Sequence, residues 1–96
     1  MNNAITEEKL NKYLDLTKKA LALVKKAEKD DKRMKEVEDL IDLSERYYSD
    51  ALHFKEKGDY VLAFSAVNYA HAFLDAGARL KLFKVSDSSL FMVDEE

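Results

Sequence analysis

The segment YYSDALHFKEKGDYVLAFSAVNYAHAFLDAGARLKLF, residues 47–83, carries most of the information about the fold. Its apolar residues recur at intervals of three and four, as on one face of a helix, and this spacing is interrupted once, at Gly58 and Asp59. Glycine is favoured immediately after a helix because it adopts positive φ without a Cβ clash, and aspartate is a good N-cap for the next helix. The stretch therefore predicts two antiparallel helices joined by a tight turn.

The same spacing, followed toward both ends of the chain, predicts three long helices, at about residues 6–29, 32–57 and 60–82. The third helix is apolar over more than half of its circumference, so we expect it to be the central and most buried one. Its alanines, together with Gly77, should let the backbones of neighbouring helices approach closely. Short connections between long helices favour an all-α fold, a three-helix up-down-up antiparallel bundle.

The ends of the predicted helices carry suitable capping residues. Thr6 can cap the first helix, and Asp30 or Asp31 can cap the second. The tail, residues 84–96, departs from helical spacing and is expected to be non-helical. Residues 82–85 and 90–93 flank the polar sequence SDSS and could pair as a small β-hairpin. An extended arm that packs on the bundle, or on another subunit, is equally compatible with this sequence.

The chain has 96 residues, enough for one domain spanning residues 1–96 and too few for two. It contains no cysteine, which excludes a disulfide framework, a thiolate metal site and a cysteine nucleophile. No apolar run approaches the roughly 20 residues that span a bilayer, and the N-terminal segment lacks the features of a signal peptide. We therefore expect a cytoplasmic protein that does not associate with membranes.

A group of residues in the second and third predicted helices resembles a known family. The group comprises Tyr48, Asp50, Ala51, Phe54, the turn Gly58-Asp59-Tyr60, Ala63, the run Tyr69-Ala70-His71 and the run Leu74-Asp75-Ala76. With these residues the chain is similar, over roughly residues 10–85, to the archaeal family catalogued as domain of unknown function 357. The resemblance implies a compact helical bundle in an archaeal cytoplasm, with no assigned activity.

Three polar residues, Asn68, His71 and Asp75, lie at positions i, i+3 and i+7 of the third helix and therefore share one face. Because buried polar groups must find hydrogen-bond partners, we expect a network between this face and the second helix. The candidate partners there are Asp50, Tyr47 and His53. As an alternative, His71 and Asp75 could share a divalent metal ion that Asp50 and His53 complete. No cofactor is implied.

The alternative interpretation of the whole chain is that it is an enzyme. It would be a small metal-dependent or ribonuclease-like protein that uses His53, His71 and Asp75. The spacing of Arg46 and His53 resembles that of the all-helical higher eukaryote and prokaryote nucleotide-binding ribonucleases. Lysines between residues 18 and 35 could contact phosphates, but interleaved acidic residues and a pI of about 5.4 argue against nucleic acid as a partner.

Aromatic residues are numerous for so small a bundle, and three helices cannot surround all of them. We therefore predict an interaction face that contains Tyr47, Tyr48, Phe54, Tyr60, Tyr69 and Phe73. Such a face would bind a protein partner or a second copy of the chain in a homo-oligomer. The function that the sequence favours is a non-enzymatic protein-interaction or scaffold module.

Overall fold

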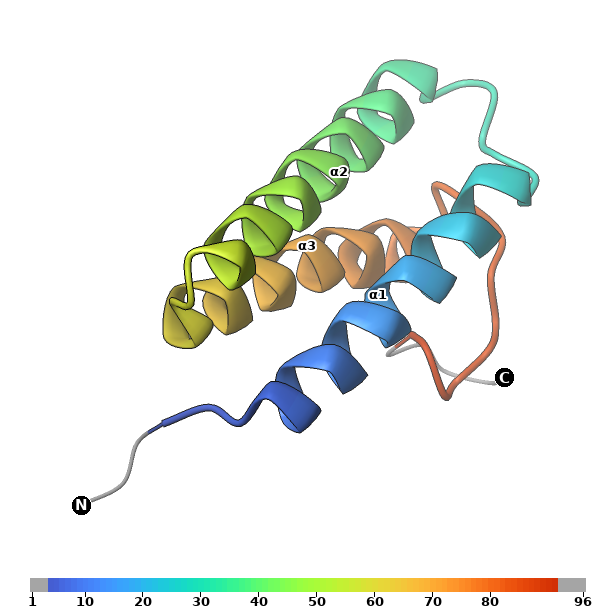
Figure 1. The fold of residues 1–96 in the computed structure, drawn as a ribbon. Coiled ribbons are helices and arrows are strands. Elements are labelled where there is room, and N and C mark those ends of the chain that lie inside the picture. The colour runs from blue at the N-terminus through green and yellow to red at the C-terminus, as the bar shows by residue number, and fades with distance from the viewer. Residues whose placement is uncertain (1–3, 92–96) are drawn as a thin grey trace.

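A computed structural model of the chain describes residues 4–91. Within those residues it contains three helices, α1 (Glu7–Lys26), α2 (Met34–Glu56) and α3 (Tyr60–Arg79). α1 and α3 run in one direction and α2 runs in the other, which makes an up-down-up bundle (Figure 1). The predicted all-α fold and three-helix arrangement are confirmed. No helix in residues 4–91 is both long enough and apolar enough to cross a membrane.

The predicted caps of α1 and α3 are confirmed. The Thr6 hydroxyl accepts a hydrogen bond from the Lys9 amide at 3.1 Å, and the Asp59 carboxylate accepts one from the Leu62 amide at 3.1 Å. Gly58 has φ of 77° just after α2, the left-handed conformation that commonly follows a helix C-terminus. These groups fix the start of α1 and the turn between α2 and α3.

The turn between α1 and α2 differs from the prediction. α2 begins after Arg33, whose side chain makes no capping hydrogen bond, so neither Asp30 nor Asp31 caps this helix. Asp30 instead accepts hydrogen bonds from the Lys32 amide at 3.0 Å and from Arg33 Nε at 2.9 Å. Both bonds lower the pKa of the Asp30 carboxyl, and the bond from the Lys32 amide has the larger effect. Asp30 therefore stabilises the turn itself.

α1 and α3 both end earlier than predicted. The segments that follow them lie side by side and are joined through their backbones. The Asp30 amide donates to the Leu82 carbonyl at 2.8 Å, and the Lys84 amide donates to the Glu28 carbonyl at 2.9 Å. Because these backbone groups bond to each other, they are not available to continue the two helices.

α3 lies between α1 and α2 and contacts both, with its most extensive contacts on α2. The Ser44 hydroxyl, fully buried, donates to the Ala70 carbonyl at 2.8 Å and links α2 to α3. The buried residues of α3 are mostly small, which lets the neighbouring helices approach. They are Ala63, Ala66, Val67, Ala70, Leu74, Gly77 and Ala78. The prediction that the third helix is central is confirmed.

Residues 80–91 fold back onto the bundle and complete its core. The side chains of Leu82, Phe83, Leu90 and Phe91 are each at most 9% exposed and belong to one cluster with residues of all three helices. The Phe83 ring lies against Gly77, where two of its carbons would be only 2.6 and 2.8 Å from an added Cβ. Gly77 therefore makes room for a ring from the tail, in contrast to the predicted approach of a helix backbone.

No β-hairpin forms among the described residues of the tail. Phe83 instead makes a single antiparallel bridge with Lys29, and the Asp87 carbonyl accepts hydrogen bonds from the amides of Leu90 at 3.0 Å and Phe91 at 2.9 Å. Residues 92 and 93, which complete the second predicted strand, lie outside the described residues. Up to Phe91 the tail is an arm that packs on the bundle.

Candidate functional site

A small pocket, with a volume of about 190 Å³, lies where α1, α3 and the tail meet. Its apolar lining consists of Tyr13, Leu16 and Ala72, and its polar lining consists of Asn68, His71, Asp75 and Ser89. Asn68, His71 and Asp75 of α3 thus line the same pocket, which lies toward α1 and the tail.

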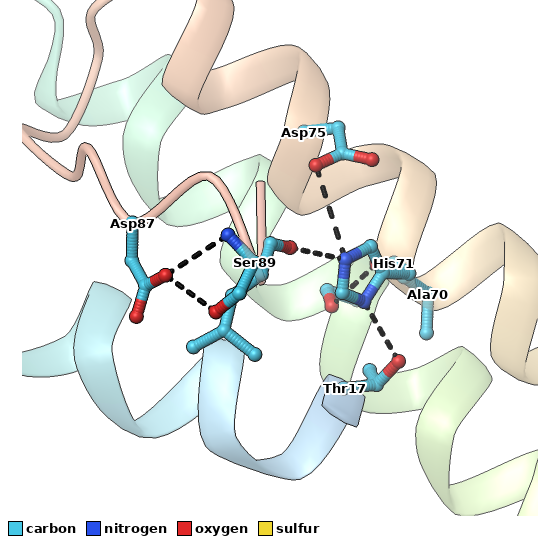
Figure 2. A network of polar contacts seen from close by, with 8 residues as sticks. Thr17, Ala70, His71, Asp75, Asp87 and Ser89 are labelled. Atoms are coloured by element: carbon cyan, nitrogen blue, oxygen red, sulfur yellow. Dashed lines mark hydrogen bonds and ion pairs between the residues drawn. The ribbon is translucent and has the colours of Figure 1, made fainter. Parts of the chain in front are cut away.

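His71 is the centre of a hydrogen-bond network beside this pocket (Figure 2). Its Nε2 lies 2.5 Å from the Leu90 carbonyl oxygen, and its Nδ1 lies 2.9 Å from the Thr17 hydroxyl oxygen. Because a carbonyl oxygen only accepts, Nε2 carries the hydrogen of the first bond, and in the neutral ring Nδ1 accepts the Thr17 hydrogen. The imidazole thus links α3 to the buried Thr17 of α1 and to the tail.

These hydrogen bonds of His71 run to α1 and the tail, and not to the partners predicted on α2. Asp50 and His53 are exposed on α2 and do not line the pocket, while Tyr47 stacks on another aromatic ring. The Ser44 hydroxyl of α2 bonds to the Ala70 carbonyl of α3, whereas the polar face of α3 meets α1 and the tail. Thr17, a hydroxyl within the otherwise apolar stripe of α1, is the signal that could have identified the partner.

The described residues do not assemble a metal centre. Asp75 Oδ1 lies 3.9 Å from His71 Nε2, and residues 4–91 contain no group of three His, Cys, Asp or Glu side chains that could hold a metal ion. Both nitrogens of the imidazole already take part in hydrogen bonds. An ion at His71 would therefore have to displace either Thr17 or the Leu90 carbonyl.

The residues of the ribonuclease-like alternative are not gathered around one cavity in the described structure. Arg46 Nε lies 2.9 Å from the Asp42 carboxylate, one turn earlier in α2. The exposed His53 ring lies edge-on to Phe54, with centroids 5.8 Å apart, and does not line the pocket that contains His71.

The aromatic residues predicted to form one interaction face divide into two groups. Tyr47, Tyr69 and Phe73 gather along α2 and α3, with the Tyr47 ring centroid 5.5 Å from that of Tyr69 and 5.7 Å from that of Phe73. Tyr69 is 57% exposed whereas Tyr47 and Phe73 are half-buried, so this group is open to solvent through Tyr69. It is the part of the predicted face that a partner could reach.

The second group, Tyr48, Phe54 and Tyr60, packs against the core. Tyr48 contacts both core clusters, and burial raises the pKa of its hydroxyl, with a further contribution from the nearby Asp15 carboxylate. These three rings are half-buried and stabilise the bundle.

A series of uncharged, mostly apolar residues also runs along the outside of α3. We call it the outer α3 stripe, and it comprises Leu62, Ser65, Tyr69, Phe73, Ala76 and Leu80. These residues recur at intervals of three and four, so they form one line on the helix surface. Leu62 and Leu80 are 46% and 58% exposed, and residues 60–74 contain no Asp, Glu, Lys or Arg.

Leu62 and Leu80 were not predicted to belong to an exposed surface. Their signal is a second series at helical spacing beside the buried one, within a segment that lacks charged residues. An exposed helix face normally carries charged or polar residues, so this composition sets α3 apart from α1 and α2.

Comparison with known families supports the resemblance noted in the sequence. The model of the family described as "Protein of unknown function (DUF357)" matches residues 12–83. The chain belongs to the DUF357 family. The match includes α2, α3 and most of α1, and it ends before the tail residues Leu90 and Phe91 that contact His71. No curated protein and no solved structure matches the chain.

Proposed function

We propose that this DUF357 protein is a non-enzymatic protein-interaction or scaffold module of the cytoplasm. Its binding surface is the outer α3 stripe, and its ligand is an apolar helix of another chain. The observation that carries the proposal is the stripe itself, an exposed series with the spacing of a buried helix face and no charged member. A partner helix would remove apolar surface from water there without desolvating a charge.

The aromatic group gives the stripe rigid anchors. Tyr69 is held against Tyr47 in a stacked geometry, and Phe73 also contacts the Tyr47 ring, with centroids 5.7 Å apart. Side chains that are already ordered lose little conformational entropy when a partner binds. Tyrosine is also enriched among residues that dominate interface energetics. We therefore expect Tyr69 to contribute more to binding than any other residue of the stripe.

The division of α3 into two faces means that binding can be tested without unfolding the protein. The face opposite the stripe contains Ala63, Val67 and Leu74, which are fully buried and hold the bundle together. A substitution on the exposed stripe leaves these contacts in place. Loss of binding and loss of fold are thus separable.

The test compares Tyr69→Arg with Leu23→Arg, a matched control at a 39%-exposed leucine of α1. Both variants should unfold close to the wild-type temperature, as judged by circular dichroism, because both sites are exposed. In affinity purification from the native organism, we expect Tyr69→Arg to reduce the recovery of bound chains about 30-fold, as for a residue worth about 2 kcal/mol of binding. Leu23→Arg should retain them. Equal recovery of the same chains by both variants would contradict the proposal.

A further inference from the structure

We infer that the chain bound at the outer α3 stripe is a second copy of this protein, with the two α3 helices antiparallel about a two-fold axis. This inference rests on the proposed function of the stripe and names its partner. A two-fold interface uses the same patch on both subunits, so the patch must be complementary to itself.

The order of residues in the stripe satisfies this requirement. Read along α3 it runs leucine, small residue, aromatic residue, aromatic residue, small residue, leucine, and it reads the same in reverse. The members in order are Leu62, Ser65, Tyr69, Phe73, Ala76 and Leu80. A two-fold axis at the level of residue 71 places Leu62 opposite the partner subunit's Leu80, and Tyr69 opposite the partner subunit's Phe73. Ser65 then lies close to the partner subunit's Ala76.

The sizes of these side chains suit close contact between helices. Ser65 and Ala76 are small, so the two backbones can approach where these residues meet. The aromatic residues meet at the axis, where each copy also contributes Tyr47, which already stacks on Tyr69. Aromatic pairs of this kind stabilise an interface beyond the effect of the area they bury.

Charge favours the antiparallel orientation over the parallel one. Arg79 lies near the C-terminal end of the stripe, beyond the charge-free segment, residues 60–74. Parallel helices would bring the Arg79 side chains of both copies to the same level, whereas antiparallel helices place each one level with the partner subunit's Ala63, inside that segment. The two helix dipoles also oppose each other in the antiparallel pair.

The length of α3 limits the strength of this association. With 20 residues the helix is about 30 Å long, and one helix pair with the flanking Tyr47 side chains makes an interface at the small end of the usual range. We therefore expect a dissociation constant in the micromolar range, so the dimer should form at high protein concentration and dissociate on dilution.

Disulfide crosslinking tests the geometry directly, because the chain has no cysteine of its own. Ser65→Cys and Ala76→Cys are made as separate proteins, both at exposed small residues. In the antiparallel dimer, residue 65 faces residue 76 of the partner, within the Cα separation of roughly 4–7 Å that a disulfide needs. Two residues at position 65 would be about 18 Å apart along the helices.

Mild oxidation of an equimolar mixture should therefore give the mixed disulfide dimer, while each variant alone should remain mostly monomeric on a non-reducing gel. Lys12→Cys, at an exposed position of α1, is the control and should not crosslink. If Ser65→Cys alone crosslinked as readily as the mixture, the two α3 helices would be parallel or would meet only in random collisions, and the inference would be overturned. So would the absence of the mixed dimer together with a monomeric mass in sedimentation velocity at high concentration. The proposed function would survive that second result if Tyr69→Arg still lost a partner that the wild type captures.

Discussion

Replacement of Phe83 by alanine is expected to lower the free energy of unfolding by about 3–5 kcal/mol, as for other fully buried aromatic residues. The Phe83 side chain is 1% exposed and is the largest of the fully buried side chains. It joins the tail to a cluster that contains residues of all three helices, so its removal would leave a cavity with fixed walls. Urea unfolding followed by circular dichroism measures this loss of stability. In thermal unfolding, the midpoint temperature should fall by roughly 12 °C or more.

Two further variants complete this test. Phe83→Leu retains much of the buried volume and should cost roughly 1.5 kcal/mol or less, which keeps the prediction measurable if Phe83→Ala does not fold. Tyr69→Ala removes an exposed aromatic ring and should change stability by no more than about 0.5 kcal/mol. If Phe83→Ala cost no more than Tyr69→Ala, the tail would not be part of the core.

Replacement of Gly77 by alanine is expected to destabilise the protein by about 1–3 kcal/mol, although the same change in an exposed helix stabilises by roughly 0.5–1 kcal/mol. The added Cβ would lie 2.6 and 2.8 Å from two carbons of the Phe83 ring. The ring cannot withdraw freely, because it is enclosed and because the Leu82 amide donates to the Gly77 carbonyl at 2.9 Å. Urea unfolding of the single variant should therefore show a lower free energy of unfolding than that of the wild type, where the same change in an exposed helix would raise it.

A double-mutant cycle identifies the contact that causes the reversal. In the Phe83→Ala background the ring is absent, so Gly77→Ala should be neutral or stabilising by up to about 1 kcal/mol. Gly58→Ala serves as the comparison, since a Cβ added at Gly58 would meet no non-adjacent group within 4 Å and its cost should come from positive φ alone, about 1 kcal/mol. An equal effect of Gly77→Ala in both backgrounds would exclude the ring as the cause.

The helices and the α2–α3 turn could be predicted from sequence because their causes are local. Gly58 supplies the positive φ that follows α2, and Asp59 accepts the Leu62 amide at the start of α3. Periodicity then gave the extent of α2 to within two residues at each end. The helix ends at residues 26 and 79 were less predictable, because the backbone groups beyond them bond to each other across the molecule.

The position of the tail could not be predicted, because the residues that hold it are distant in sequence. Phe83 fits against Gly77 only after the chain has turned back, and Leu90 is held by a histidine of the preceding helix. The sequence of the tail has no period that would reveal these contacts. A glycine in a helix indicates close approach of some group, but it does not identify the group.

The polar face of α3 was predicted only in part. Spacing establishes that Asn68, His71 and Asp75 share a face, since this follows from helix geometry. Which neighbour that face meets depends on the side of α3 on which α1 and α2 lie, and periodicity alone does not fix this. His71 therefore bonds to Thr17 of α1, where the prediction had named residues of α2.

Which aromatic residues stay exposed was also predicted only in part, because α3 carries two apolar series that overlap in sequence. The excess of aromatic residues indicated that some would remain exposed. Which ones they are depends on the direction of each helix: Tyr69 is exposed, whereas Tyr48 and Tyr60 are half-buried. The charge-free segment, residues 60–74, is the sequence feature that best marks the exposed series.

The outer α3 stripe should bind another copy of the chain. Dilution of the uniformly nitrogen-15-labelled protein from millimolar to micromolar concentration, followed by amide chemical shifts, measures this self-association residue by residue. We predict concentration-dependent shifts at Leu62, Tyr69, Phe73 and Leu80, with unchanged shifts along the exposed side of α1. Spectra that do not change with concentration, or changes confined to α1, would contradict the claim.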